Sequence, residues 1–367
     1  MSWRLLLIVL GIASLAGLFF IVTRFRRFSR LKALGTRSPL LSWLAALLAA
    51  VLPVGAVALF VNLFTAVVVF LHLVLIWLLC ELVGWILRRI RRTAPRRYWV
   101  GAAALILTCG VLAAGWCSAH FVRRTAYTIR TEKALTAPVR VVEIADSHLG
   151  VTLGAERFAR ELERVRAEEP DLLVIVGDFV DDDTTAEEMR IACEALGTLK
   201  PRYGIFFVFG NHDKGYYQYR DFSSAELRSA LAENGVTILE DGIGEPDCGL
   251  TVIGRQDRTA RDRASAQKLT EALDRSRFLL MLDHQPNDYA AEAASGADLV
   301  LSGHTHGGHI WPAGLIGLAL GSNDRVYGYE KRGDTEFIVT SGIAGWAIPI
   351  KTGTFSEYVV IDILPRT

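Results

Sequence analysis

Between Leu40 and Leu87 the sequence runs for 48 residues in which the only charged or histidine side chains are His72 and Glu81. A single helix needs about 20 apolar residues to cross the hydrocarbon core of a bilayer, so this run is long enough for two crossings. We expect the chain to turn near Asn62, between the two helices. A run this long and this apolar excludes an ordinary soluble fold for this part of the chain.

Two further apolar segments flank this run. Residues 5–22 are uncharged and are followed by arginines rather than by a small-residue cleavage site, so we interpret them as a retained anchor and not as a signal peptide. Residues 98–118 form another apolar segment of membrane-spanning length. The sequence therefore predicts a transmembrane anchor region over residues 1–120, with helices at 3–23, 40–60, 64–87 and 98–118.

The positions of basic residues predict the orientation of these helices. Lysines and arginines fill the loops at residues 24–37 and 88–97, whereas the turn near Asn62 has none. The positive-inside rule places both basic loops in the cytoplasm, and four crossings then place both ends of the region outside. We expect a multi-pass protein of the cell membrane with an extracytoplasmic C-terminal region. Because Glu81 precedes Arg88 by two helical turns, we expect an interfacial ion pair and an anchoring role rather than transport.

The charge balance changes sharply along the chain. Residues 1–140 contain 18 Lys+Arg and two acidic residues, whereas the remainder contains 22 Lys+Arg and 37 Asp+Glu. This change predicts a linker over residues 121–138 and a separate domain over 139–367. The acidic second part argues against a nucleic-acid partner, which would require clustered basic residues. The spacing of Cys193 and Cys248 leaves open whether they pair.

From Val139 onward, short apolar segments alternate with segments of helical periodicity. "VRVVEIAD", "DLLVIVGD" and "GIFFVFGNHD" read as buried strands, and Ala155–Glu168 reads as a helix between the first two. Thr184 and Glu187 have the spacing of a capping box for a helix that extends through Leu196. Strands that alternate with helices indicate an α/β layered fold.

Polar residues recur at the C-terminal ends of these strands, where open α/β sheets bind ligands. Six of the eight histidines lie in this second region, each at or just after a predicted strand end. Imidazole and carboxylate groups gathered at one edge predict a metal site. The residues that we expect to converge there are Asp146, His148, Asp178, Asn211, His212, His284, His304 and His306.

The motifs Asp146-x-His148, Gly177-Asp178, Gly210-Asn211-His212-Asp213, His284 and Gly303-His304-x-His306 resemble, in order and spacing, those of the calcineurin-like metallophosphoesterases. The resemblance covers about residues 139–364, and the segment 326–363 further resembles the membrane-associated bacterial branch. It implies a two-sheet sandwich flanked by helices. It also implies a membrane-anchored enzyme that hydrolyses a phosphodiester, a phosphomonoester or a lipid-linked pyrophosphate by means of a metal-activated hydroxide.

The resemblance further implies two divalent cations, of Mn, Fe or Zn. One would be held by Asp146, His148, Asp178 and His306, and the other by Asp178, Asn211, His284 and His304, so that Asp178 bridges them. His212 would be the catalytic residue that stabilises the transition state or protonates the leaving oxygen. Asp213 would orient His212 or a ligand, or would be a surface residue, and His309 would lie at the rim.

Several features leave the reaction open. Asp182 replaces the arginine that binds phosphate in the related protein phosphatases, which argues against a phosphoprotein substrate. We interpret Asp181–Asp183 as a solvated helix start and residues 311–320 as a core segment. In the alternative interpretation of the latter, Trp311, Leu315, Ile316 and Leu318 form a lip that contacts the membrane or a lipid tail. A catalytically silent phospho-ligand sensor or scaffold on the same fold is the alternative function.

Overall fold

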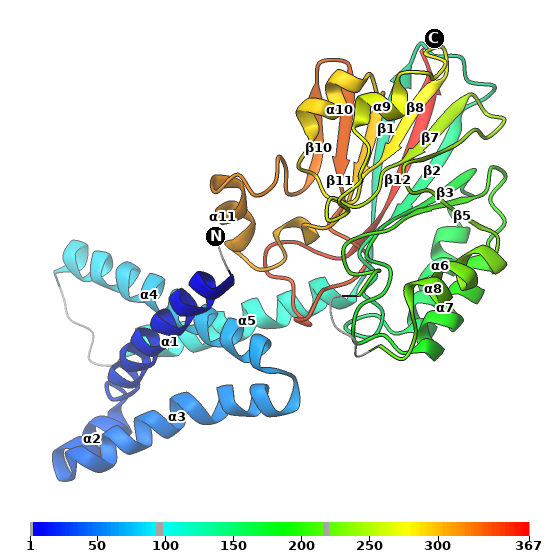
Figure 1. The fold of residues 1–367 in the computed structure, drawn as a ribbon. Coiled ribbons are helices and arrows are strands. Elements are labelled where there is room, and N and C mark those ends of the chain that lie inside the picture. The colour runs from blue at the N-terminus through cyan, green and yellow to red at the C-terminus, as the bar shows by residue number, and fades with distance from the viewer. Residues whose placement is uncertain (1–2, 93–97, 216–219, 367) are drawn as a thin grey trace. The chain divides into compact units, whose positions relative to one another are not determined.

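The computed structural model describes residues 3–92, 98–215 and 220–366 (Figure 1). It divides into two compact units, Met1–Ala114 and Gly115–Thr367. The first unit is helical, and the second contains all of the described strands.

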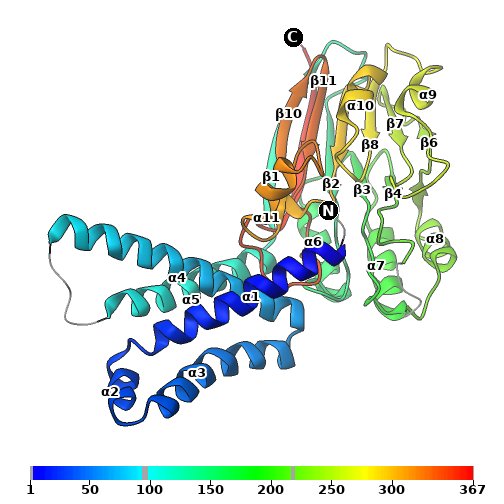
Figure 2. The ribbon, with the colours of Figure 1, turned by 60° about the vertical axis from the view of Figure 1, so that its left-hand side comes forward.

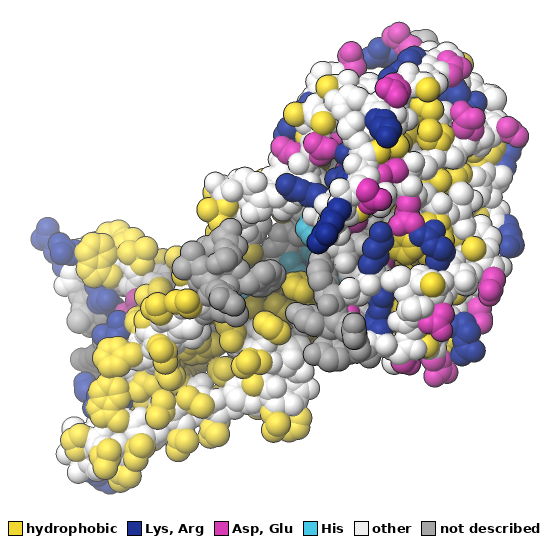
Figure 3. All heavy atoms as spheres, in the orientation of Figure 1, with side chains coloured by type: hydrophobic (Ala, Val, Ile, Leu, Met, Phe, Trp, Pro, Cys, Tyr) yellow, Lys and Arg dark blue, Asp and Glu magenta, His cyan; other side chains and the backbone are white. Residues whose placement is uncertain are grey.

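The helical unit confirms the four predicted apolar helices, with slightly longer bounds than the sequence suggests. They are α1 (Trp3–Phe25), α3 (Pro39–Phe60), α4 (Leu63–Arg91) and α5 (Trp99–His120), and a short α2 (Ser29–Arg37) joins the first two. Each of the four long helices is long and apolar enough to cross a membrane. Their outer surface is covered largely by hydrophobic side chains, whereas the surface of the second unit mixes both signs of charge (Figure 3).

The predicted turn near Asn62 is present and has a clear local cause. Helix α3 ends at Phe60, and the Asn62 side chain accepts a hydrogen bond of 2.7 Å from the backbone N–H of Thr65. This bond satisfies one of the unpaired N–H groups at the start of α4, as an N-cap residue does.

The expected pairing of Glu81 with Arg88 is wrong. Glu81 instead lies 3.0 Å from Arg24 and 3.0 Å from Arg27, both near the end of α1. It also accepts a hydrogen bond from the Tyr98 hydroxyl. The two guanidinium groups and the Tyr98 hydroxyl together give this carboxylate three partners. A pair with Arg88 on its own helix would give it only one. Glu81 therefore has a structural partner set, which supports the anchor interpretation.

The second unit contains two six-stranded sheets, as the fold prediction requires (Figure 1). The first has the order β1 (Arg123–Thr131), β12 (Glu357–Pro365), β2 (Val139–Ile144), β3 (Leu172–Val176), β4 (Ile205–Val208) and β5 (Val236–Ile238). The second has the order β10 (Gly328–Arg332), β11 (Thr335–Val339), β9 (Leu299–Ser302), β8 (Phe278–Leu282), β7 (Leu250–Gly254) and β6 (Gly242–Gly244).

Helices cover the outer faces of both sheets (Figure 2). Helices α6 (Ala155–Arg166), α7 (Ala186–Thr198) and α8 (Ser224–Glu233) pack on the first sheet, and α9 (Ala266–Thr270) and α10 (Tyr289–Ser295) pack on the second. Strand residues alternate between layers: Val141 faces the other sheet, whereas Val142 faces the helices. This alternation follows from the two-residue period of a strand and produces a four-layer sandwich.

Two local predictions differ from the structure. Residues 123–131, assigned to the linker, form β1. The capping box uses Thr185 and Glu188 and not Thr184 and Glu187, because the Thr184 hydroxyl is already engaged by Leu149 and Asp181.

The expectation that residues 311–320 form a core segment is also wrong. Helix α11 (Ala313–Ala319) buries none of its residues, and Leu315 and Ile316 are 62% and 52% exposed. Cys193 and Cys248 are both free thiols, and each is buried in a different hydrophobic cluster.

Candidate metal centre

The seven predicted metal ligands all follow strand ends, and they come from both sheets. In the first sheet, β2, β3 and β4 end just before Asp146, Asp178 and Asn211. In the second sheet, β8 and β9 end just before His284 and His304. Because these strands are parallel neighbours within each sheet, their carboxyl ends meet at one edge. His148 lies two residues after Asp146, and His306 lies two residues after His304.

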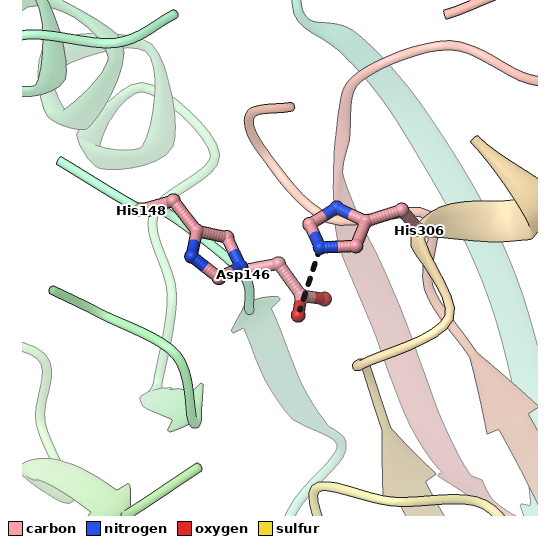
Figure 4. Close-up of side chains that lie close together, drawn as sticks. All are labelled: Asp146, His148 and His306. Carbon is pink, nitrogen blue, oxygen red and sulfur yellow. Dashed lines mark ion pairs between the residues drawn. The ribbon is translucent and has the colours of Figure 1, made fainter. Parts of the chain in front are cut away.

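The structure brings Asp146, His148 and His306 together, as predicted for one cation. One ligand atom from each lies within 4.8 Å of the others. Figure 4 shows the two imidazole rings on either side of the Asp146 carboxylate, with His306 Nε2 3.8 Å from Asp146 Oδ1. All three side chains are buried.

A second group contains Asp178, His284 and His304, as predicted for the other cation. Asp178 joins the two groups through one atom. Its Oδ2 lies 3.1 Å from His284 Nε2 and 3.6 Å from His148 Nε2, one imidazole from each group. One oxygen of Asp178 thus lies between the two groups, where a shared ligand would have to lie.

Asn211 lies next to this second group. The backbone N–H of His212, the residue after it, donates to Asp178 Oδ1 at 2.8 Å. The amide of Gln285 lies 3.4 Å from Asn211 Oδ1 and also donates to Asp257. Asn211 is 9% exposed, and Gln285, which its side chain contacts, directly follows the predicted ligand His284 in the sequence.

The backbone at these positions is held in an unusual conformation. Ten non-glycine residues in the described ranges have positive φ, and five of them are predicted ligands. The left-handed region costs an ordinary L residue about 1–3 kcal/mol, so such residues persist only where the surrounding structure requires them. Five ligands in this region therefore point to a functional site. The five are Asp146, His148, Asp178, His304 and His306.

Glycines precede several ligands because the site has no space for a side chain there. A Cβ on Gly177 would lie 2.5 Å from His284 Nδ1, and one on Gly303 would lie 2.5 Å from Asp146 Oδ2. Gly177 also has a φ of +77°. The Gly-Asp and Gly-His pairs of the sequence are thus required by close packing of the ligands.

Hydrogen bonds orient two of the imidazoles and leave one nitrogen of each directed into the site. His148 Nδ1 lies 3.0 Å from Asp181 Oδ2, and His284 Nδ1 lies 2.8 Å from the Val176 carbonyl. Nε2 of His148 and Nδ1 of His306 are buried and have no hydrogen-bond partner among the described residues, and Nε2 of His284 lies 3.1 Å from Asp178 Oδ2. Buried nitrogens without partners are costly unless a ligand uses them. The donor set therefore fits divalent cations of the transition series.

The electrostatics of the site agree with this fit. Burial disfavours the charged form of Asp178, but the imidazoles of His284 and His148 hold the pKa of this carboxyl well below its usual value. Burial lowers the pKa of His304 to about 4, so this ring is neutral and can donate its lone pair. Burial raises the pKa of Asp146 to about 6, although the nearby imidazoles of His284 and His148 oppose this shift.

Asp181 is a residue that sequence reasoning missed. It was expected to belong to a solvated helix start, but it is only 6% exposed. Its two oxygens contact Nδ1 of two histidines, His148 at 3.0 Å and His212 at 2.9 Å. It therefore fixes the ring orientation of one predicted ligand and of the predicted catalytic residue. Its role could not be recognised in the sequence because it is one of three consecutive aspartates, 181–183, and such a run is usually solvated.

Of the alternatives expected for Asp213, the contacts agree with orientation of a ligand, and the side chain is buried rather than at the surface. Its carboxylate accepts hydrogen bonds from the backbone N–H groups of Asp178, Phe179, Val180 and Gly210. Asp181, and not Asp213, contacts the imidazole nitrogen of His212. Asp213 thus holds the loop that carries Asp178 and positions this predicted ligand. His309 lies beside His306, with ring centroids 5.3 Å apart, and its Nε2 contacts the Ile348 carbonyl.

Asp181→Asn is expected to lower metal affinity by about 10- to 100-fold, as loss of a partner that orients a ligand does. An amide can contact one imidazole as an acceptor, but it offers its second neighbour an NH₂ group. The measurement is competition of the purified protein with a chelator for Mn²⁺. Asp183→Asn, an exposed position in the same run, is the matched control. Equal affinities in the two variants would contradict the positioning role of Asp181.

The calcineurin-like phosphoesterase family profile matches residues 139–308. A metallophosphoesterase of Aquifex aeolicus is 30% identical over 253 residues, which cover 66% of this chain and 92% of that protein. One from Helicobacter pylori is 31% identical over 242 residues, covering 63% of this chain and 61% of that protein. The chain thus spans about three fifths of the length of the Helicobacter relative.

A vertebrate relative has a name that refers to both parts of the chain. The "transmembrane protein with metallophosphoesterase domain" of Bos taurus is 32% identical over 235 residues, which cover 60% of this chain and 51% of that protein. Together with the four long apolar helices, this likeness supports membrane association.

Proposed function

The chain belongs to the calcineurin-like metallophosphoesterase family, and from this premise we propose that it hydrolyses phosphoester bonds at a centre of two divalent cations. The substrate class covers phosphodiesters, phosphomonoesters and lipid-linked pyrophosphates. The cations are of Mn, Fe or Zn, because imidazole with carboxylate suits these metals better than it suits Ca²⁺.

One observation carries this proposal. A single oxygen, Asp178 Oδ2, faces an imidazole nitrogen from each of the two ligand groups. Two cations that lie close together repel each other, so a dinuclear centre needs a shared anionic ligand at this place. The first cation would be held by Asp146, His148, Asp178 and His306. The second would be held by Asp178, Asn211, His284 and His304.

When bound, the two cations would supply the positive charge that polarises the phosphoryl group and lowers the pKa of water. The protein residues perform the remaining tasks. Asp213 holds the loop that carries Asp178, and Asp181 holds the imidazole ring of His148. The family motif and the structure together support His212 as the residue that acts on the leaving oxygen.

His212 is suited to donate a proton. Burial lowers the pKa of this imidazole, but the hydrogen bond to Asp181 and the nearby Asp178 outweigh burial, so that the pKa lies above its usual value. With Nδ1 engaged by Asp181, Nε2 is the nitrogen that can donate to a leaving alkoxide. A general acid should be protonated near the working pH, and a raised pKa favours the protonated form.

We also propose that the helical region anchors the enzyme in the cell membrane with the α/β domain outside the cytoplasm. Helix α1 is followed by a basic loop and α4 ends in one, whereas the turn at Asn62 carries no basic residue. The Arg24 and Arg27 contacts with Glu81 support the assignment of both basic segments to the same membrane face.

The proposed activity is tested with purified full-length protein and added Mn²⁺. The panel compares bis(4-nitrophenyl) phosphate, 4-nitrophenyl phosphate and a lipid-linked pyrophosphate. Turnover of at least one substrate is expected, with loss on chelation and recovery on Mn²⁺ addition, because the bound cations would lower the pKa of the attacking water. Full activity in protein that elemental analysis finds free of metal would contradict the proposal.

Orientation is tested separately with a protease-cleavable tag placed after Thr367. Protease added to intact cells is expected to remove the tag, because the positive-inside pattern puts the α/β domain outside. A cytoplasmic tag on a known inner-face protein is the control for cell integrity. Cleavage only after the membrane is broken would overturn the proposed orientation.

A further inference from the structure

We propose that α11 and the end of α5 form an apolar surface that inserts into the lipid bilayer at the headgroup–acyl boundary, beside the metal centre. This surface, called here the lipid-facing surface, consists of Trp116, Phe121, Trp311, Leu315, Ile316, Leu318 and Leu320. Nothing in the proposed chemistry uses these side chains.

The first argument is the concentration of exposed apolar side chains. Among residues 115–215 and 220–366, nine large hydrophobic side chains are exposed, and seven of them belong to the lipid-facing surface. Leu315 and Leu320 are 62% and 60% exposed, and Trp311 is 46% exposed. No charged residue occurs between His309 and Asp324. Exposed apolar groups that gather in one place, rather than scattering singly, mark an interaction site.

The second argument is the connection to a membrane-spanning helix. The backbone N–H of Lys351 donates to the Gly115 carbonyl of α5 at 2.9 Å, and Ser356 donates to Ser118 at 2.8 Å. The same 351–356 loop holds the start of α11, because the N–H of Trp311 donates to Thr352 Oγ1 at 3.1 Å. The end of α5 and the start of α11 are thus fastened to one loop.

Helix α5 has the length and composition of a membrane span. Residues fastened to its last turns must therefore lie near the level at which the helix leaves the bilayer. Trp116 and Phe121 stand at this exit and are 49% and 64% exposed. Aromatic side chains are enriched at that level of a membrane protein. A bilayer is accordingly the occupant that the chain continuity favours over a soluble protein partner or a second copy.

The third argument is the short path from this surface to the metal centre. A Cβ on Gly314 of α11 would lie 2.8 Å from the Cα of Gly308. Gly308 is two residues from His306, a predicted ligand. The backbone N–H of Gly353 also donates to the His309 carbonyl at 2.9 Å. Insertion of α11 therefore fixes the histidine loop against the headgroup region, where phosphoesters of lipids lie.

The substrate consequence rests on the proposed function: the enzyme would act on phosphoesters carried by membrane lipids. The surface itself is tested without reference to activity. The full chain is reconstituted in vesicles of phosphatidylcholine and phosphatidylglycerol, with a benzophenone amino acid at Leu315. Illumination is expected to attach lipid at this position. The matched control is the same amino acid at Ile243, which is exposed on β6 in the α/β unit. Attachment only to another protein chain, or none, would overturn the proposed surface.

A second experiment links the surface to turnover. Leu315→Asp with Ile316→Asp is expected to lower hydrolysis of a nitrophenyl phospholipid in vesicles by about tenfold or more, because two exposed apolar contacts with lipid are lost. Hydrolysis of soluble bis(4-nitrophenyl) phosphate should be unchanged, and Ile243→Asp should leave both rates unchanged. Equal rates on the vesicle substrate would refute lipid engagement. Absence of both activities in the unmodified protein would instead count against the proposed function, and the crosslinking result would still stand.

Discussion

Asp178→Asn is expected to lower turnover of the preferred substrate by on the order of 10³-fold, because metal ions contribute several kcal/mol to transition-state charge stabilisation and each 1.4 kcal/mol is about tenfold. The amide keeps the size of the side chain and can still accept the hydrogen bond from His212 N–H. It removes the shared negative charge that faces both imidazole groups. Steady-state kinetics and metal analysis of the same preparation measure the effect.

Asp183→Asn serves as the matched control for this variant, because it is exposed and changes the charge by the same amount. It should retain the metal content and turnover of the unmodified protein. Retention of full metal content together with normal turnover in Asp178→Asn would refute the bridging assignment. Thermal unfolding of both variants separates loss of the centre from loss of the fold.

His212→Ala is expected to lower turnover by about 10²- to 10⁴-fold, the usual contribution of a general acid or base. Metal content should be retained, because His212 belongs to neither predicted ligand set. The loss should be larger for an alkyl phosphoester than for a nitrophenyl ester, since nitrophenolate leaves without a proton. Kinetics with the two leaving groups provide the measurement.

His309→Ala is the control for removal of an imidazole from the same region. It lies beside His306 but is expected at the rim, so metal content and leaving-group dependence should not change. Loss of bound metal in His212→Ala, of the size expected for removal of the predicted ligand His306, would identify His212 as a ligand. The proposed role as general acid would then be wrong.

The layered fold and the grouping of the ligands could be predicted from sequence because both rest on local patterns. Short apolar strands that end in Asp, Asn or His show where a parallel sheet gathers polar groups, whatever the details of the intervening loops. The resemblance supplied the assignment of each ligand to one of two cations. The structure places one ligand atom from each of Asp146, His148 and His306 within 4.8 Å of the others, which strand order alone could not establish.

Partnerships between distant residues could not be predicted in the same way. Glu81 has Arg88 at a helical spacing in its own segment, yet it pairs with Arg24 and Arg27 from another helix. Asp181 is one of three similar residues, and only the turn after β3 directs it to His148 and His212. Such choices depend on tertiary packing, which periodicity does not report.

The boundary of the α/β domain was the least predictable feature. Strand β1 contains only one fully buried aliphatic residue, Ile129, and is flanked by arginines, so it resembles a basic tail. Its side chains nevertheless alternate between exposed and covered positions, as a half-buried strand requires. The strand is stabilised by pairing with β12, from the other end of the domain sequence.

This pairing has a practical consequence for anyone who wishes to release a soluble catalytic fragment. Strand β1 protects β12 along nine residues, from Arg123 opposite Glu357 to Thr131 opposite Pro365. A fragment that starts at Val139, where the family profile begins, would leave that flank of β12 without its neighbour. Unpaired strand flanks recruit other chains and aggregate. Fragments cut ahead of Arg123 should therefore stay monodisperse where those cut at Val139 precipitate.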